Sequence, residues 1–197
     1  MIIGLTGGIG SGKSVISNQL RQMGYSVYDT DSEAKRLIME DVHVREQIEH
    51  LFGKDVYRNG VYQTAMVAQQ VFANPSLLAR LNAIVHPAVH QDIIRWVSKQ
   101  NSPSFKKGKG VSLLFIECAI LYQAGIDQFC DKVVAVTAPE QVRLERVIAR
   151  DHSDKERVHA RMRAQDVDKD MLCADIILNN DGRTPIPTLC EEILKLI

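Results

Sequence analysis

The sequence lacks any excess of charge of one sign, any long apolar run and any visible targeting segment. Its 197 residues include 24 Lys and Arg against 24 Asp and Glu, for a formal net charge of zero. A dedicated nucleic-acid binder usually carries a basic excess, so the balance argues against that class. No apolar stretch reaches the roughly 18 residues of a membrane-spanning helix, and no signal peptide is visible. We therefore expect a cytoplasmic protein with neither a nucleic-acid nor a membrane partner.

Cysteine is also scarce, and its spacing excludes two further classes. None of the four cysteines forms a C-x-x-C pair, so neither a zinc site nor a disulfide framework is indicated. We expect buried thiols in a reducing compartment. Hydrophobic residues make up 45% of the chain, which is enough for one sizeable core. The cysteines are Cys118, Cys130, Cys173 and Cys190.

The most informative feature that is present is a glycine-rich segment. Residues 7–14 read Gly-Gly-Ile-Gly-Ser-Gly-Lys-Ser and follow an apolar run. They match the phosphate-binding loop G-x-x-x-x-G-K-[ST]. Glycines let the backbone curl around phosphate, while N–H groups and the positive end of the next helix face the anion. Lys13 is expected at the β- and γ-phosphates and Ser14 on Mg²⁺. The expected ATP-binding residues here are Gly8, Gly10, Ser11, Gly12, Lys13, Ser14 and Val15.

Short apolar strands alternate with helical stretches along the chain. This order favours a doubly wound α/β fold with a five-stranded parallel sheet. Between the second and third strands lies a long, mainly helical insertion, with a predicted turn at residues 58–60 and a helix break at His86-Pro87. Residues 101–110 are expected to form a solvent loop. The predicted strands are residues 1–6, 26–28, 111–117, 132–137 and 175–178.

Asp29-Thr30-Asp31 follows the second predicted strand. In open α/β sheets the ligand lies beyond the carboxyl ends of the strands, so a carboxylate here can accept a proton from an attacking hydroxyl or help to hold a metal. Acidic residues also suit the start of a helix. Spacing alone leaves both interpretations of this segment open.

An arginine-rich stretch forms two predicted helices separated at residues 151–154. Acidic residues are interleaved, so a solvated, salt-bridged helix pair is one interpretation. Beside a phosphate loop, the arginines can instead close over the γ-phosphate as a lid and exclude water. We favour the lid. The arginines are Arg143, Arg146, Arg150, Arg157, Arg161 and Arg163.

Two classes of function fit these features: a small-molecule kinase, and a nucleotide switch or motor ATPase. The switch motifs Asn-Lys-x-Asp and Asp-x-x-Gly are absent from the sequence. For an ATPase, the nearest candidate for the acidic residue that ends a strand is Glu117. Small size, the helical insertion and the arginine-rich lid favour the kinase.

Several separate motifs together resemble the dephospho-CoA kinase family. The resemblance runs from residue 1 to about residue 182 and is weakest near residues 98–112. Its motifs are Gly-Leu-Thr-Gly-Gly-Ile-Gly-Ser-Gly-Lys-Ser at residues 4–14, Asp-Thr-Asp at 29–31, Val-Phe-Ala-Asn-Pro at 71–75, Leu-Asn-Ala-Ile-Val-His-Pro at 81–87, Leu-Glu-Arg at 144–146 with Arg-Asp at 150–151, and residues 174–182.

The resemblance implies transfer of the γ-phosphate of ATP, with Mg²⁺, to the ribose 3′-hydroxyl of dephospho-CoA. Lys13, Asp31 and Arg150 become the catalytic residues, with Asp31 as general base. Arg146 and Asn180 join the ATP site. His86 is expected to touch the acceptor, as Asp31 would, although a structural histidine at a helix break fits equally.

The resemblance also implies a P-loop kinase-like, three-layer α/β/α fold with a five-stranded parallel sheet, as one domain over residues 1–197. We expect a monomer or weak homo-oligomer. Its core is expected at about residues 1–30, 111–150 and 175–197. The acceptor-binding insertion is expected at about residues 31–110 and the lid at about 151–174.

Among the departures from the family pattern, two concern the acceptor region. Gln123 stands where the family usually has a glutamate, and Thr64 where it usually has an arginine. These changes bear on acceptor affinity more than on the type of reaction. The alternative functions are another P-loop nucleoside or nucleotide kinase and, more distantly, a non-kinase NTPase.

Overall fold

The computed structural model describes residues 1–102, 113–152, 154–163 and 171–197. The chain forms two compact units. One comprises Met1–Asp29 and Lys106–Ile197, and the other comprises Thr30–Phe105. Most of the predicted solvent loop at residues 101–110 lies outside the described residues.

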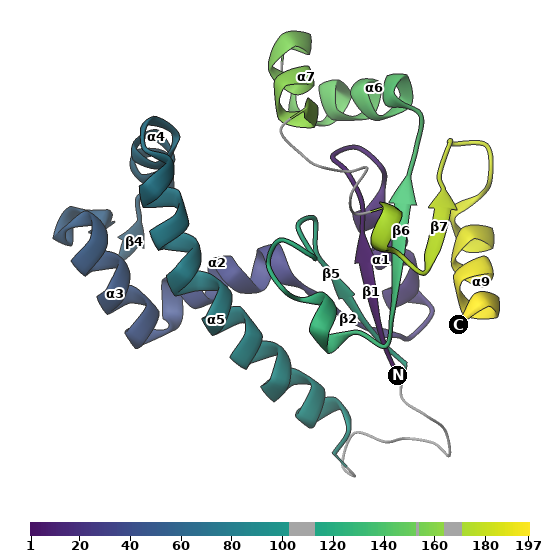
Figure 1. Cartoon of the computed structure of the whole chain (residues 1–197), viewed down its shortest axis with the longest axis horizontal. Helices are drawn as coiled ribbons and strands as arrows, with labels where there is room; N and C mark the ends of the chain where they lie inside the picture. The colour runs from purple at the N-terminus through teal and green to yellow at the C-terminus, as the bar shows by residue number, and fades with distance from the viewer. Residues whose placement is uncertain (103–112, 153, 164–170) are drawn as a thin grey trace. The chain divides into compact units, whose positions relative to one another are not determined.

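A five-stranded sheet forms the centre of the first unit (Figure 1). Every pairing is parallel, in the order β2-β5-β1-β6-β7. The α/β class and the five-stranded parallel sheet are therefore confirmed. Residues 111 and 112 of the predicted third strand lie outside the described residues. The strands are β1 (Ile2–Thr6), β2 (Ser26–Asp29), β5 (Leu114–Glu117), β6 (Lys132–Thr137) and β7 (Ile176–Asn179).

Two helices, α1 (Lys13–Gln22) and α9 (Ile186–Leu196), pack against each other and against this sheet. Alternate residues of β1, Ile3 and Leu5, join the apolar cluster beneath them. Between them Gly4 faces the other way, where an added Cβ would meet Leu121 and Cys130. Both faces of the central strand are therefore covered, which explains its unbroken apolar sequence.

A pair of helices follows β6. They are α6 (Glu140–Asp151) and α7 (Lys155–Arg163), and His152 ends the first of them in the left-handed region at φ 48°. Their apolar stripes form a small cluster of their own, against which Ile9 of the glycine-rich loop packs. The buried members of this cluster are Leu144, Val147, Val158 and Met162.

The described residues of the second unit form helices and one short hairpin, and the unit has its own apolar core. The predicted turn is confirmed: Asn59 and Gly60 both have positive φ, as a tight hairpin turn requires. The elements are α2 (Thr30–Glu40), α3 (Val42–Phe52), the 3-10 turn η1 (Lys54–Val56), β3 (Tyr57–Arg58), β4 (Val61–Tyr62), α4 (Thr64–Ala73) and α5 (Pro75–Gln100).

The predicted helix break at His86-Pro87 is wrong, because α5 runs unbroken through Pro87. An internal proline removes one backbone hydrogen bond and costs about 3 kcal/mol. Val85, Val89 and Ile93 are buried on both sides of it, and each buried aliphatic side chain contributes about 1.5–3 kcal/mol. Tertiary packing on α2, α3 and α4 thus outweighs the local signal.

All four cysteines are thiols rather than disulfide partners, but the expectation that all are buried is wrong. Cys118 and Cys190 are buried, Cys130 is half-buried and Cys173 is exposed. Burial raises the pKa of the Cys130 thiol to about 12, so this thiol stays protonated. Within the described ranges, no helix has the length and apolar character needed to cross a membrane.

Candidate active site

The glycine-rich loop joins the carboxyl end of β1 to the first turn of α1. β1 is the central strand, with β5 on one side and β6 on the other. The chain passes to opposite sides of β1 at this point, and such a switch point is where open parallel sheets bind ligands. Because α1 begins at Lys13, its unpaired N–H groups face the loop.

Two glycines let neighbouring elements pack directly on the loop. Gly10 has φ 79° and Gly12 has φ 96°, conformations that side chains rarely adopt. A Cβ on Gly10 would collide with the backbone of Arg143 on α6, and a Cβ on Gly12 would collide with the amide of Asn180. The loop is therefore held from outside by two segments that lie far away in the sequence.

Lys13 lies across this loop. Its ammonium donates to the carbonyl oxygen of Gly7 at 2.6 Å and reaches that of Gly8 at 3.5 Å. The positive charge is thus held over the inside of the curled backbone, where the loop would bind phosphate. Val15, two residues further along α1, is 52% exposed.

Ser14 is paired with a carboxylate that sequence reasoning did not include in the site. Its hydroxyl donates to Oε1 of Glu117 at 2.7 Å. Glu117 is the last residue of β5, only 7% exposed, and stands in register with Leu5 and Asp29. The signal in the sequence is a carboxylate that ends an apolar strand, a feature that is also typical of ATPases.

Arg146 and Asn180 together bind the backbone of the loop. The Arg146 guanidinium donates to the carbonyls of Gly10, Ser11 and Asn180 at 3.1–3.4 Å. The Asn180 amide, 2% exposed, donates to Ser11 O at 2.8 Å. Both predicted residues thus lie at the loop.

Arg150 lies one helical turn beyond Arg146 on α6 and is exposed. Its guanidinium binds the neighbouring Asp151 at 2.7 and 3.2 Å. The hydrogen bond to Asp151 raises the pKa of Arg150 above its ordinary value, so its positive charge is permanent.

Asp31 and His86 belong to the second unit. Asp31 is exposed in the first turn of α2, and this position suits both a reacting carboxylate and a favourable charge at a helix start. His86 is half-buried in α5. Burial, aided by neighbouring His90, lowers the pKa of His86 below its ordinary 6.5.

The depressed pKa of His86 predicts a pH-dependent stability. The unfolded chain binds the proton more tightly, so stability is lost as the pH falls from 6.5 toward the folded-state pKa. We expect the unfolding midpoint to drop between about pH 7.5 and about pH 5.5, and His86→Gln to reduce this drop. His43→Gln, at an exposed histidine of α3, is the control. Equal slopes in wild type and His86→Gln would contradict the prediction.

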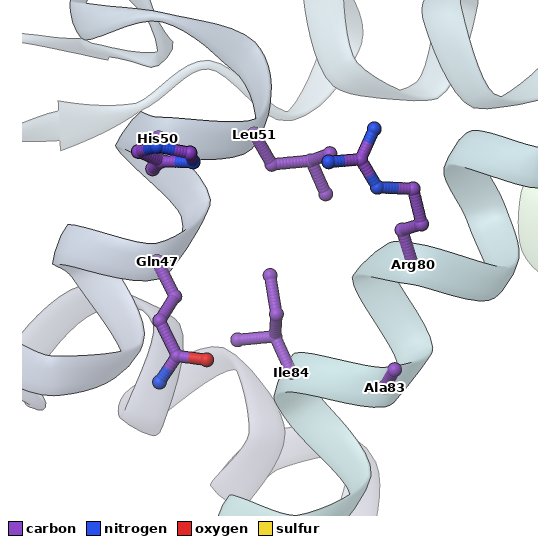
Figure 2. Close-up of a pocket in the computed structure, with 6 residues that line it drawn as sticks. All are labelled: Gln47, His50, Leu51, Arg80, Ala83 and Ile84. Carbon is purple, nitrogen blue, oxygen red and sulfur yellow. The ribbon is translucent and has the colours of Figure 1, made fainter.

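A separate pocket of about 360 Å³ lies within the second unit (Figure 2). Helix α3 provides one wall and the first turns of α5 provide the other. Its lining is part polar and part apolar, and it contains none of the predicted site residues. The lining residues are Gln47, His50, Leu51, Arg80, Ala83 and Ile84.

The sheet order, the loop after its central strand and the arginine-bearing helix pair against that loop define a class of protein. This class is the P-loop kinases.

Comparison with known proteins identifies the family within this class. The model of the dephospho-CoA kinase family matches residues 1–185. A dephospho-CoA kinase from Porphyromonas gingivalis is 41% identical over 198 residues, which cover 99% of this chain and 92% of the relative. The chain therefore belongs to the dephospho-CoA kinase family, a family of ATP-dependent kinases.

Solved structures share the fold of this chain. TT1252 from Thermus thermophilus matches with a TM-score of 0.81 and 33% identity, covering 99% of this chain and 94% of that one. A dephospho-CoA kinase from Campylobacter jejuni, 20% identical, matches with a TM-score of 0.68, covering 98% and 95% of the two chains. The second likeness concerns the fold alone.

Proposed function

We propose that this chain transfers the γ-phosphate of ATP to the ribose 3′-hydroxyl of dephospho-CoA, giving CoA and ADP. Family membership supports the overall reaction. The observation that carries the chemistry is the loop after β1, with the Lys13 ammonium held over it at 2.6 Å from Gly7 O. This arrangement concentrates N–H donors and one cation where a triphosphate develops charge during transfer.

Lys13 has the first role in this proposal. Its ammonium would contact the β- and γ-phosphate oxygens and stabilise the charge that moves onto them in the transition state. The loop amides from Gly8 to Ser14 would hold the phosphates in line, and Val15 would border the same anion at the first turn of α1. The loop is braced by Arg146 and Asn180, so these donors are arranged before the ligand arrives.

The residues at Ser14 fit Mg²⁺. A hydroxyl and a carboxylate lie 2.7 Å apart, and hard oxygen ligands are those that Mg²⁺ prefers. Mg²⁺ is commonly held by one or two protein oxygens plus substrate phosphates, so a complete protein cage is unnecessary. Ser14 would bind the ion directly, and Glu117 would orient that hydroxyl. When bound, the ion would neutralise charge on the phosphates.

Asp31 would act at the acceptor. Its exposed carboxylate would accept the proton of the 3′-hydroxyl as that oxygen attacks phosphorus, which is the role of a general base. His86 would contact the acceptor from α5. The helical segment at residues 31–110 would therefore form the acceptor-binding part of a single kinase domain.

The arginine-rich helices would form the lid, at about residues 151–174. Arg150 would reach the transferred phosphate and help to exclude water, which otherwise competes with the acceptor. Arg146 and Asn180 would border the ATP site from the loop side. A cytoplasmic monomer or weak homo-oligomer without nucleic-acid or membrane partners completes the proposal.

The test is to incubate the purified protein with Mg-ATP and dephospho-CoA and to measure acceptor mass and ADP release together. A phosphate-sized mass gain with equal ADP release is expected. ADP without a mass gain would indicate an ATPase instead. If neither product forms, a screen of nucleosides and nucleotides would test the related-kinase alternative, with Gln123 and Thr64 as the first positions to revert to glutamate and arginine.

Glu117→Gln provides a sharper test of the magnesium arrangement. The amide keeps the shape and can still accept from Ser14, but it removes a buried negative charge beside the ion. We expect activity to fall by about tenfold or more and the Mg²⁺ concentration for half-maximal rate to rise. Glu145→Gln, an exposed glutamate of α6, is the control. An unchanged Mg²⁺ dependence would contradict the role given to Glu117.

A further inference from the structure

Two arginines from different helices converge on a single carboxylate in the lid. Arg150 of α6 donates through Nε to Asp151 Oδ1 at 2.7 Å and through a second nitrogen to Oδ2 at 3.2 Å. Arg161 of α7 donates to the same Oδ2 at 2.7 Å. The Asp151 side chain is 23% exposed, whereas those of Arg150 and Arg161 are 67% and 48% exposed. The carboxylate is the most enclosed member of the cluster.

The position of Asp151 is unfavourable for a carboxylate by itself. It is the last residue of α6, and the carboxyl end of a helix carries partial negative charge that repels an anion. The two guanidinium groups more than offset this. Their hydrogen bonds, that of Arg150 first, hold the pKa of Asp151 well below its ordinary value. A residue that breaks a local rule and is rescued by specific partners often has a function.

The cluster lies on a helix that is fixed to the phosphate loop. Arg146, four residues before Arg150, binds the loop carbonyls of Gly10 and Ser11. Residues four apart lie on one helix face about 6 Å along the axis. Arg150 is thus one turn away from direct contact with the loop, on the same side of α6.

The second partner extends the link to α7. This helix packs on α6 through buried Val158 and Met162, and Ile9 of the loop packs against the same cluster. Arg161 lies in the last turn of α7. The ion pairs therefore connect α6, which is bound to the loop and carries Arg150, to α7.

We propose that Asp151 is a positioning residue, which orients the Arg150 guanidinium toward the transferred phosphate and couples it to α7 through Arg161. The proposal rests on the phosphate-contacting role of Arg150 given above. Bidentate pairing uses Nε and one terminal nitrogen of Arg150. The other terminal nitrogen keeps its donors for phosphate, in a plane that Asp151 fixes.

Asp151→Asn removes the interaction with the arginines without changing the size of the side chain. Asparagine has the same size, but one oxygen becomes an NH₂ group that cannot accept from arginine. We expect kcat/KM for ATP to fall by about tenfold, a coupling within the range of contacting charged pairs, with KM for dephospho-CoA unchanged. Asp154→Asn is the matched control, because Asp154 is an exposed acid three residues further on.

A double-mutant cycle tests whether Asp151 acts through Arg150. In an Arg150→Ala background, Asp151→Asn is expected to cause no further loss of kcat/KM for ATP. Arg161→Ala by itself is expected to cause a smaller loss, and adding it to Asp151→Asn is expected to cause no further loss. If the fold-losses of Asp151→Asn and Arg150→Ala multiply in the double mutant, the positioning role of Asp151 is overturned. Wild-type activity in Arg161→Ala would overturn the coupling to α7.

A binding measurement keeps this test independent of the acceptor. Titration with a non-hydrolysable ATP analogue and Mg²⁺ is expected to show the same non-additive pattern in Kd, and the NMR signal of the Arg150 Nε–H is expected to shift and exchange faster with water in Asp151→Asn. If the wild-type protein failed to phosphorylate dephospho-CoA, the proposed function would be wrong. The Kd values of the single and double mutants for the ATP analogue would still test the role of Asp151. Unchanged Kd and an unchanged Arg150 signal in Asp151→Asn would overturn the inference.

Discussion

Lys13→Ala is expected to lower kcat by about a hundred- to a thousandfold, while the protein remains folded. The ammonium lies across the loop, 2.6 Å from Gly7 O. In phosphoryl transfer such a charge acts mainly in the transition state, because negative charge shifts onto the β- and γ-phosphates as the bond breaks. Its loss should therefore appear in kcat more than in KM.

The fold should tolerate this change because, among the described residues, Lys13 is outside the three apolar clusters given above. Its hydrogen bonds to the carbonyls of Gly7 and Gly8 are ones that water can replace. Lys195→Ala, an exposed lysine on α9 of the same unit, is the control for loss of one surface charge. The measurements are steady-state kinetics with dephospho-CoA and a thermal unfolding midpoint for each variant. Unchanged turnover in Lys13→Ala would falsify the phosphate-loop mechanism.

Asp31→Asn is expected to lower kcat by about a hundred- to ten-thousandfold, the usual contribution of a general base, with little change in KM for dephospho-CoA. Asparagine keeps the size of the side chain and can still hydrogen-bond the 3′-hydroxyl, but it cannot take up the proton. An interaction made only in the transition state lowers kcat and kcat/KM equally. Steady-state kinetics with each substrate varied in turn measure this.

The competing interpretation of Asp31 is a favourable charge at the start of α2. A variant at Glu33 distinguishes the two interpretations, because Glu33 is also an acidic residue in the first turn of that helix. If Asp31 acts only on the helix dipole, both Asp31→Asn and Glu33→Gln should lower stability by less than about 1 kcal/mol and leave kcat alone. A normal kcat with a raised KM in Asp31→Asn would make it a binding residue.

The loop prediction depended on information that is local in the chain. Residues 7–14 carry their own turn signal, since Gly7, Gly10 and Gly12 lie at positive φ and α1 begins at Lys13. The strands were similarly readable, because a parallel strand covered on both faces is a short apolar run. The predicted range 132–137 coincides with β6.

The prediction at His86-Pro87 failed for the opposite reason. Proline is a strong local signal against a helix, but Val85, Val89 and Ile93 are buried along the same helix. Whether a helix continues through a proline depends on whether packing outweighs one lost hydrogen bond. That packing comes from α2, α3 and α4, which no window around residue 87 contains.

By itself the sequence determined the class of fold and the phosphate loop, because short apolar strands and the glycine-rich motif are each encoded in residues a few positions apart. Only the tertiary structure decided which side chains meet. Ser14 and Glu117 are 103 residues apart in the chain, and Asn180 and Ser11 are 169 apart. Neither pair has a spacing that propensity or periodicity could reveal. They meet because β1 and β5 pair in parallel and because β7 ends beside the loop, and these are consequences of how the whole sheet packs.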